Sequence, residues 1–281
     1  MNSKSLQAHI EILRPLNGLM MMAVVGVAVV LSQEGSHNWF AVTIAALVGG
    51  LVGSAANAIN DYFDLGIYTI NRPYRPLPRG AMSPRAAIIL CAVLSLLGIS
   101  LNVFLHWTAL LIAVVAVIVL FWYSARLKRT VLLGNLAVAL MTALAFIYGG
   151  SVAGHPERSI IPAVFAFLIN MGREIVKDIE DMEGDLHGNA ATFPIRFGVR
   201  KSLVLAAGVF AVLIGTTIGA FVWGNYNVMF LILVLIVDSM VAAGMVLIWR
   251  NQSPKNLTSM SGLLKVSMAV GLAAIYFGSQ A

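Results

Sequence analysis

Two short stretches of this 281-residue chain concentrate acidic side chains at helical spacing. Six of the twelve acidic residues fall within positions 174–185, in the sequence REIVKDIEDMEGD. Four of these carboxylates are spaced to share one face of a helix, and they are Glu174, Asp178, Asp181 and Asp185. The sequence therefore predicts a carboxylate-bearing helix face at this point of the chain.

The second stretch, NAINDYFDLGIYTINRPYRPLPRG, occupies positions 57–80. If a helix continues through it, Asn57, Asp61 and Asp64 share one face, and Asn60 lies beside them. Together the two stretches hold eight of the twelve acids. Because each one closes an apolar run and precedes a long loop, their similarity hints at an internal duplication.

Solvated charge at the membrane interface explains an ordinary run of acids, but it fits these two faces poorly. Carboxylates at the C-terminal end of a helix oppose the helix dipole. Several carboxylates close together near hydrocarbon resist ionisation unless cations offset them. Carboxylate and amide oxygens are the ligands that Mg²⁺ takes, and Mg²⁺ commonly bridges protein carboxylates to substrate phosphates. With many Arg and Lys residues nearby, the two faces predict a magnesium–diphosphate site.

The elements that must position these faces are membrane spans. Hydrophobic residues make up 59% of the chain and charged residues 11%, whereas a soluble domain is roughly 25% charged. Nine apolar runs are long enough to cross a bilayer as helices, without the alternation of an outer-membrane barrel. They lie near 16–32, 40–59, 86–104, 107–123, 133–152, 159–177, 202–222, 226–249 and 260–278. The predicted fold is all-α, a single bundle of nine transmembrane helices in one domain over residues 1–281.

The basic residues predict the orientation of this bundle. With nine spans, the N-terminus and every second loop fall on one side, and that set holds sixteen of the eighteen Lys and Arg residues. Only Arg158 falls in an opposite loop, and Lys265 lies in the last span. The positive-inside rule then places the N-terminus in the cytoplasm and the C-terminus outside. Both carboxylate faces lie on the cytoplasmic side of this cell-membrane protein, and the net charge of +6 is no evidence for a nucleic-acid partner.

The order of these segments resembles the UbiA superfamily of intramembrane prenyltransferases over essentially the whole chain. NDYFD with NRPYRPLPRG resembles the first Asp-rich motif of the family and its following loop, and KDIEDMEGD with TFPIRFG resembles the second. RPLN at 14–17 and YSARLKRTVLLGN at 123–135 resemble the start of the first span and the connection between spans four and five. The segment REIVKDIEDMEGD is most similar to the branch that transfers a geranylgeranyl group to geranylgeranylglyceryl phosphate in ether-lipid synthesis. It is less similar to the quinone-forming and haem O branches.

The resemblance implies that a prenyl group moves from an allylic diphosphate to a membrane-soluble acceptor, with two Mg²⁺ ions bound. Asp61 and Asp64, with Asn57 or Asn60, are expected to hold one ion. Asp181 and Asp185 are expected to hold the other, and Asp178 lies one turn earlier as a ligand or an acceptor-side partner. No obligate protein partner is indicated.

Several cations and polar residues are expected to bind substrate. Lys128, Arg72 and Arg126 are candidates for the diphosphate oxygens, with Lys177 as a further possibility, although such side chains often only anchor helix ends by snorkelling. The leaving diphosphate makes an allylic cation, which aromatic faces stabilise. Tyr123 is the strongest candidate for this role, ahead of Tyr62, Phe146 and Tyr148, for each of which ordinary packing is the competing explanation. Asn17, at the start of the first span, is expected to face the site or to cap the helix end.

One position departs from the family pattern. Tyr68 stands where relatives usually carry another Asp, four residues after Asp64, which predicts weaker metal binding in the first cluster. The acceptor also stays open, because an aromatic ring of the 4-hydroxybenzoate or naphthoate type is the alternative to a phosphate-bearing lipid. A more distant alternative is a secondary transporter, whose acidic residues lie mid-span. Asp238 alone does so here, as a functional group or as a hydrogen-bonded one.

Overall fold

The computed structural model describes residues 3–188, 190–224 and 226–279, and the regular elements in these residues are all helices. In chain order the helices are α1 (Ser3–Leu13), α2 (Pro15–Ser32), α3 (Trp39–Phe63), α4 (Leu65–Asn71), α5 (Pro84–Ser100), α6 (Trp107–Ala125), α7 (Leu133–Ala153), α8 (Ile160–Glu180), α9 (Met182–His187), α10 (Phe193–Phe197), α11 (Val199–Trp223), α12 (Val228–Arg250) and α13 (Pro254–Gly278). Short 3₁₀ helices are η1 (Leu101–Phe104), η2 (Leu127–Arg129) and η3 (Pro156–Ser159). The all-α prediction is confirmed.

Nine helical segments in the described residues are long and apolar enough to cross a membrane, which confirms the predicted number of spans. The largest difference in bounds is at the last span, which was predicted from residue 260 and begins at Pro254. Ser253 caps this helix by accepting a hydrogen bond from the backbone N–H of Asn256. Pro254 suits the first helical position because it lacks the N–H group that would have no partner inside the helix there. These local signals extend the helix over a polar segment that hydropathy alone leaves out.

The chain folds into two compact units. The first contains the residues up to Lys128 together with 144–159, and the second contains residues 129–143 together with those from Ile160 onward. Helix α7 therefore contributes its first half to one unit and its second half to the other. A single domain over residues 1–281 stays a prediction.

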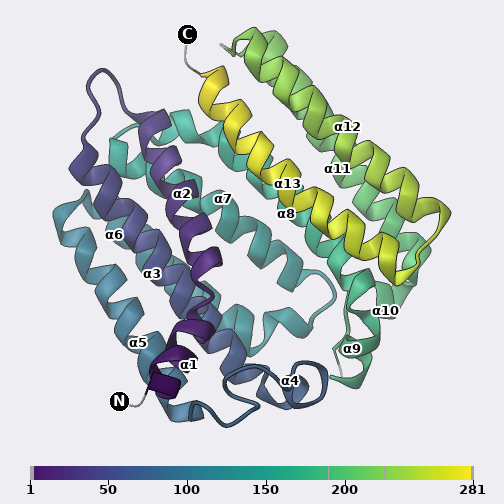
Figure 1. The fold of residues 1–281 in the computed structure, drawn as a ribbon. Helices are drawn as coiled ribbons and strands as arrows, with labels where there is room; N and C mark the ends of the chain where they lie inside the picture. Colours follow the sequence, from purple (N-terminus) through teal and green to yellow (C-terminus); the bar gives the residue numbers. More distant parts are fainter. Residues whose placement is uncertain (1–2, 189, 225, 280–281) are drawn as a thin grey trace. The chain divides into compact units, whose positions relative to one another are not determined.

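In the first unit, α3 packs against α2, α5 and α6 (Figure 1). A glycine permits the close approach of α2 and α3, because a Cβ atom at Gly49 would lie 2.7 Å from Cγ2 of Val25. Small residues at helix contacts are typical of membrane bundles. In lipid the hydrophobic effect does not drive helices together, so their association depends on close van der Waals packing.

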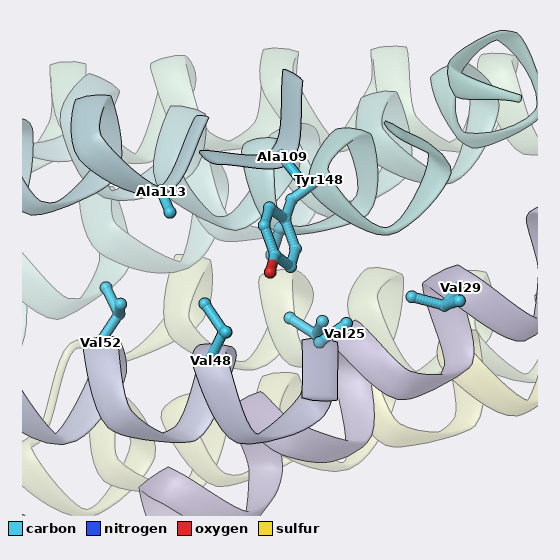
Figure 2. Close-up of a cluster of buried hydrophobic side chains, with 9 residues drawn as sticks. Val25, Val29, Val48, Val52, Ala109, Ala113 and Tyr148 are labelled. Atoms are coloured by element: carbon cyan, nitrogen blue, oxygen red, sulfur yellow. The ribbon is translucent and has the colours of Figure 1, made fainter. Parts of the chain in front are cut away.

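The core of this unit is built from small and branched apolar side chains of α2, α3, α6 and α7. Figure 2 shows the ring of Tyr148 pointing into the space beside Val25 and Val48, with Ala109 behind it. The hydroxyl of Tyr148 donates a hydrogen bond of 2.9 Å to Oδ1 of Asn102. The hydroxyl of Tyr148 therefore has its partner inside the core. This favours ordinary packing for Tyr148 over the stabilisation of an allylic cation.

The amphipathic helix α1 covers the end of α3 that carries the first carboxylate face (Figure 1). Its buried side, Ala8 and Ile12, packs in a small cluster with Ala58 of α3, while Leu6 on the other side is exposed. The position of this helix determines where Arg14, the residue that follows it, can reach.

In the second unit, α8 packs against both α11 and α13, and α12 packs against α13 and α11 (Figure 1). Gly172 of α8 lies so close to α11 that a Cβ atom there would be 2.4 Å from the ring of Phe210. Helix α8 is held tightly as a result, and it carries the second carboxylate face.

Candidate active site

The first carboxylate face ends in a local break of the helix. Helix α3 stops before Asp64, whose φ of −91° and ψ of 3° lie outside the helical region, and α4 begins directly after it. The backbone ladder nevertheless continues. The N–H of Asp64 donates to the carbonyl of Asn60 at 3.0 Å, and the N–H of Tyr68 donates to the carbonyl of Asp64 at 2.9 Å. Tyr68 therefore lies one turn beyond Asp64, as the sequence spacing predicted.

The second face repeats this geometry. Asp181 interrupts the helical path between α8 and α9 with a φ of −90° and a ψ of 1°. Its N–H donates to Lys177 at 2.8 Å, and the N–H of Asp185 donates to the carbonyl of Asp181 at 2.9 Å. The equivalent positions are Asp61 and Asp178, Asp64 and Asp181, and Tyr68 and Asp185. This shared break supports the duplication that the sequence indicated.

In the first cluster both carboxylates are buried, and cations neutralise them. Asp61 is 1% exposed and accepts hydrogen bonds from Arg14 and from Nη1 of Arg75, which lies 2.8 and 3.0 Å from its two oxygens. Asp64 is 2% exposed and forms an ion pair with Lys128. Its Oδ2 also accepts a 2.9 Å hydrogen bond from Nδ2 of Asn60. These partners place positive charge and hydrogen-bond donors beside both buried side chains, as buried charges require.

Tyr68 is an integral member of this cluster. Nδ2 of Asn60 lies 3.4 Å from its hydroxyl oxygen, and the guanidinium carbon of Arg75 lies 4.6 Å from the centre of its ring. Burial, followed by the negative charge of Asp64, raises the pKa of Tyr68, and Arg14 offsets this only in part. The phenol is therefore neutral near pH 7, so it cannot replace an aspartate as an anionic metal ligand.

The sequence analysis missed the part that Arg14 plays. This residue has a φ of 51°, in the left-handed region that non-glycine residues adopt at a cost of about 1–3 kcal/mol. Its buried Nε has no hydrogen-bond partner. Burial lowers the pKa of Arg14, but the charges of Asp61 and Tyr68 and the hydrogen bonds to them together raise it above its usual value. The available signal was the RPLN segment, in which Arg14 directly precedes the first span.

Arg75 was also missed as a partner of Asp61. Its side chain reaches back over Tyr68 to a carboxylate that is fourteen positions earlier. Arg72 lies near the same ring, at 5.7 Å from the centre. Together with Arg14 and Lys128, Arg75 makes three cations paired with Asp61 and Asp64 in the first unit.

The second cluster is more open. Oδ2 of Asp178 accepts a 2.8 Å hydrogen bond from Nδ2 of Asn135, at the start of α7. Nζ of Lys177 lies 3.6 Å from Oδ2 of Asp181, whose side chain is 44% exposed. Buried Glu174 forms an ion pair with its neighbour Arg173. Asn135 was not assigned a role from the sequence, although it ends the segment YSARLKRTVLLGN that resembles the family.

Other predicted site residues lie less centrally. Nδ2 of Asn57 donates to the backbone carbonyl of Leu13 at 3.0 Å, so this amide ties α3 to the segment before Arg14. Asn17 and Arg126 are exposed. Tyr123 is partly buried near the end of α6. Their substrate-binding roles stay predictions.

The mid-span Asp238 is a hydrogen-bonded residue. It is buried in α12, where its Oδ2 accepts a 3.0 Å hydrogen bond from the hydroxyl of Thr217 in α11. This contact links two neighbouring helices and favours the packing explanation for Asp238. Asp238 was the one mid-span acid that could support a transporter, so this contact weakens the transporter interpretation.

The oxygen donors suit Mg²⁺, provided that substrate completes the coordination shell. No group of three or more His, Cys, Asp or Glu side chains converges closely enough to hold a metal within the parts of the chain that the structure describes. Each cluster instead offers a carboxylate pair with a nearby amide. Mg²⁺ is commonly held by one or two carboxylates together with substrate phosphates and waters, so this donor set is sufficient.

Known proteins resemble this chain over most of its length. The model of the UbiA prenyltransferase family matches residues 19–269. The digeranylgeranylglyceryl phosphate synthase of Methanothermobacter thermautotrophicus is 37% identical over 275 residues, which cover 96% of this chain and 95% of that protein. The synthase of the same name from Thermococcus gammatolerans is 39% identical over 276 residues, which cover 96% and 97%.

Solved structures share the fold. A structure of digeranylgeranylglyceryl phosphate synthase in membranes matches with a TM-score of 0.82 and 29% identity over 98% of each chain. A UbiA homolog from Archaeoglobus fulgidus, bound to GPP and Mg²⁺, matches with a TM-score of 0.72 and 21% identity over 95% of this chain and 99% of that chain. The resemblance inferred from the Asp-rich stretches is confirmed.

Proposed function

Because this chain belongs to the UbiA prenyltransferase family, we propose that it transfers a geranylgeranyl group from its diphosphate to geranylgeranylglyceryl phosphate within the membrane. The observation that carries this proposal is the full-length similarity to relatives named digeranylgeranylglyceryl phosphate synthase, at 37% and 39% identity. The protein is a multi-pass membrane enzyme. The two carboxylate clusters give it the groups that such a transfer needs.

The chemistry of the donor assigns the cations of the first cluster. As the allylic C–O bond breaks, negative charge develops on the leaving diphosphate, and preorganised positive groups stabilise it. Lys128 and Arg75 lie beside Asp64 and Asp61, where they can bind diphosphate oxygens. The allylic cation left behind requires an aromatic face and shelter from water, which we assign to Tyr123.

The carboxylates are assigned to Mg²⁺, which when bound neutralises charge on the diphosphate. Asp61 and Asp64 with Asn60 would hold one ion, and Asp181 with Asp185 a second. The Archaeoglobus fulgidus homolog bound to GPP and Mg²⁺ supports the use of this metal. Since Asp61 and Asp64 are paired with Arg14, Arg75 and Lys128, these cations would have to turn from the carboxylates to the diphosphate if both carboxylates held the metal.

The acceptor is tested directly by supplying purified protein with Mg²⁺, geranylgeranyl diphosphate and one of two acceptors. Product is expected with geranylgeranylglyceryl phosphate and not with 4-hydroxybenzoate. Prenylation of the aromatic acid alone would reject the proposed acceptor in favour of a quinone-precursor activity. Failure with both acceptors, by a protein that remains folded, would reject both alternatives.

We predict that Tyr68→Asp lowers the Mg²⁺ concentration that gives half-maximal activity. The new carboxylate would lie one turn from Asp64, at the position equivalent to Asp185, and would add a hard oxygen ligand to the first cluster. A magnesium titration at saturating prenyl diphosphate measures the midpoint, and Tyr68→Phe is the control that removes only the hydroxyl. An unchanged midpoint in Tyr68→Asp would mean that this position adds no ligand.

The active site is proposed to face the cytoplasm, on the basis of the one-sided distribution of Lys and Arg. In a Cys91→Ser background, a cysteine at Ser36 and one at Gln252 test this, because both positions are exposed in loops assigned to opposite sides. A membrane-impermeant maleimide is expected to label the variant at Ser36 in intact cells and the variant at Gln252 only after lysis. The reverse pattern would invert the orientation.

A further inference from the structure

Beside its carboxylate face, helix α8 carries a second polar stripe that the metal chemistry does not use. Arg173, Lys177 and Glu180 follow one another at i, i+4 and i+7, so they share a face. At about 100° per residue, this face lies roughly a quarter turn round the helix from the one that bears Asp178 and Asp181. The stripe therefore borders the second cluster.

Helix α13 faces this stripe with a polar surface of its own. The carboxylate of Glu180 accepts hydrogen bonds from the hydroxyls of Thr258, at 2.8 Å, and Ser261, at 2.5 Å. These contacts join the last turn of α8 to the second turn of α13, and the two helices pack along each other in opposite directions (Figure 1). One turn beyond Ser261, Lys265 lies on the same face of α13. Because the two helices run in opposite directions, the rise per residue from the Glu180 contacts predicts that Lys265 lies near the level of Arg173 and Lys177.

Two cationic side chains along this contact have donor groups without a partner among the described residues. Lys265 is exposed well inside a membrane span and forms no ion pair with any residue that the structure describes. A lysine at such depth is costly unless it has a partner or reaches the interface, and it marks function by default. The guanidinium of Arg173 donates through Nη1 to Glu174 at 2.5 Å, but its buried Nε has no partner. Together they predict an anionic ligand.

We propose that Lys265, with Arg173 and Lys177, binds the phosphate monoester of the lipid acceptor. The inference rests on the proposed function and adds the subsite that selects an acceptor with a phosphate. Phosphate oxygens accept strong charge-assisted hydrogen bonds from ammonium and guanidinium groups. Lys265 is exposed, and its long side chain can extend from the span toward the interface, where the phosphate of a lipid lies. The donor diphosphate is assigned to the metal ions and to Lys128 and Arg75. Glu180, held by its two hydroxyl donors, fixes the register that brings Lys265 level with Arg173.

The test compares Lys265→Gln with the wild-type enzyme on two acceptors, geranylgeranylglyceryl phosphate and the same lipid without its phosphate. Loss of one charged hydrogen bond is expected to raise KM for the phosphate-bearing acceptor about tenfold or more. The KM for prenyl diphosphate and the rate with the dephosphorylated lipid should stay within about twofold of wild type, since the substitution removes no other contact. Lys265→Arg should restore the phosphate preference, and Lys255→Gln, an exposed lysine at the start of α13, is the matched control.

A direct binding measurement separates this inference from the proposed function. Binding of each radiolabelled acceptor is measured without prenyl diphosphate, so that it does not depend on turnover. Weaker binding of the phosphate-bearing lipid alone supports the subsite, even if the wild-type enzyme transfers no prenyl group to it. Equal loss with both lipids, or none, overturns it. If Lys265→Gln instead raises the KM for prenyl diphosphate, Lys265 binds the donor. If the variant is less inhibited by added anionic phospholipid than the wild type while its acceptor KM is unchanged, Lys265 binds ordinary lipid headgroups. Either result overturns the inference.

Discussion

Substituting Asp64 or Asp181 by Ala is expected to lower the rate of Mg²⁺-dependent prenyl transfer by about three orders of magnitude or more. Losing a ligand to a catalytic metal removes several kcal/mol of transition-state stabilisation, and each 1.36 kcal/mol is a factor of ten in rate. The two residues occupy equivalent positions at the break between two helices, so the same substitution removes the same kind of ligand from each cluster.

The two variants should differ in stability. Asp64 is buried and paired with Lys128, so its removal also leaves a partly buried ammonium without its partner. Asp181 is 44% exposed at its side chain and should be removed at little cost in folding. Melting temperatures in detergent, measured beside the rates, separate the two effects, and Asp64→Asn preserves the side-chain shape. Glu157→Gln, at an exposed position of the 3₁₀ helix η3, is the control. A variant with near-normal turnover would exclude that residue from the metal site.

The second large effect is expected from Arg75→Lys, which keeps the charge but should lower kcat/KM for the prenyl diphosphate about a hundredfold. One guanidinium nitrogen of Arg75 reaches both oxygens of Asp61, at 2.8 and 3.0 Å, while the group stacks over the ring of Tyr68. A lysine ammonium is a compact point charge on a flexible stem, and it cannot reproduce the planar group that lies over the ring of Tyr68. The buried Asp61 would also lose part of its hydrogen bonding.

Arg79 in the same loop is the matched control. Its guanidinium pairs with Glu11 in an exposed position and donates to the backbone carbonyl of Tyr74. Exposed pairs of this kind contribute about 0–1 kcal/mol, so Arg79→Lys should keep most of the activity. The comparison is made at saturating acceptor with initial rates over a range of donor concentrations. Equal activities of the two variants would contradict a special role for Arg75.

The sequence alone determined the membrane spans, because crossing a bilayer depends on local properties of the chain. A helix satisfies its own backbone hydrogen bonds, and about 20 apolar residues are enough to cross the hydrocarbon. The faces that carry Asp61 with Asp64, and Asp178 with Asp181, were likewise predictable from spacing within one helix. The bound at Pro254, where the difference from the prediction is largest, depends on capping signals that hydropathy does not contain.

The partners of those carboxylates were decided only by the tertiary structure. Asp61 is 47 positions from Arg14, and Asp64 is 64 positions from Lys128. Which cation reaches which oxygen depends on how neighbouring helices are rotated and shifted, and close contacts such as Gly49 against Val25 set that register. The same holds for Glu180 and Ser261, which are 81 positions apart. Spacing along one helix places a side chain on a face, but only packing between helices brings a second side chain to meet it.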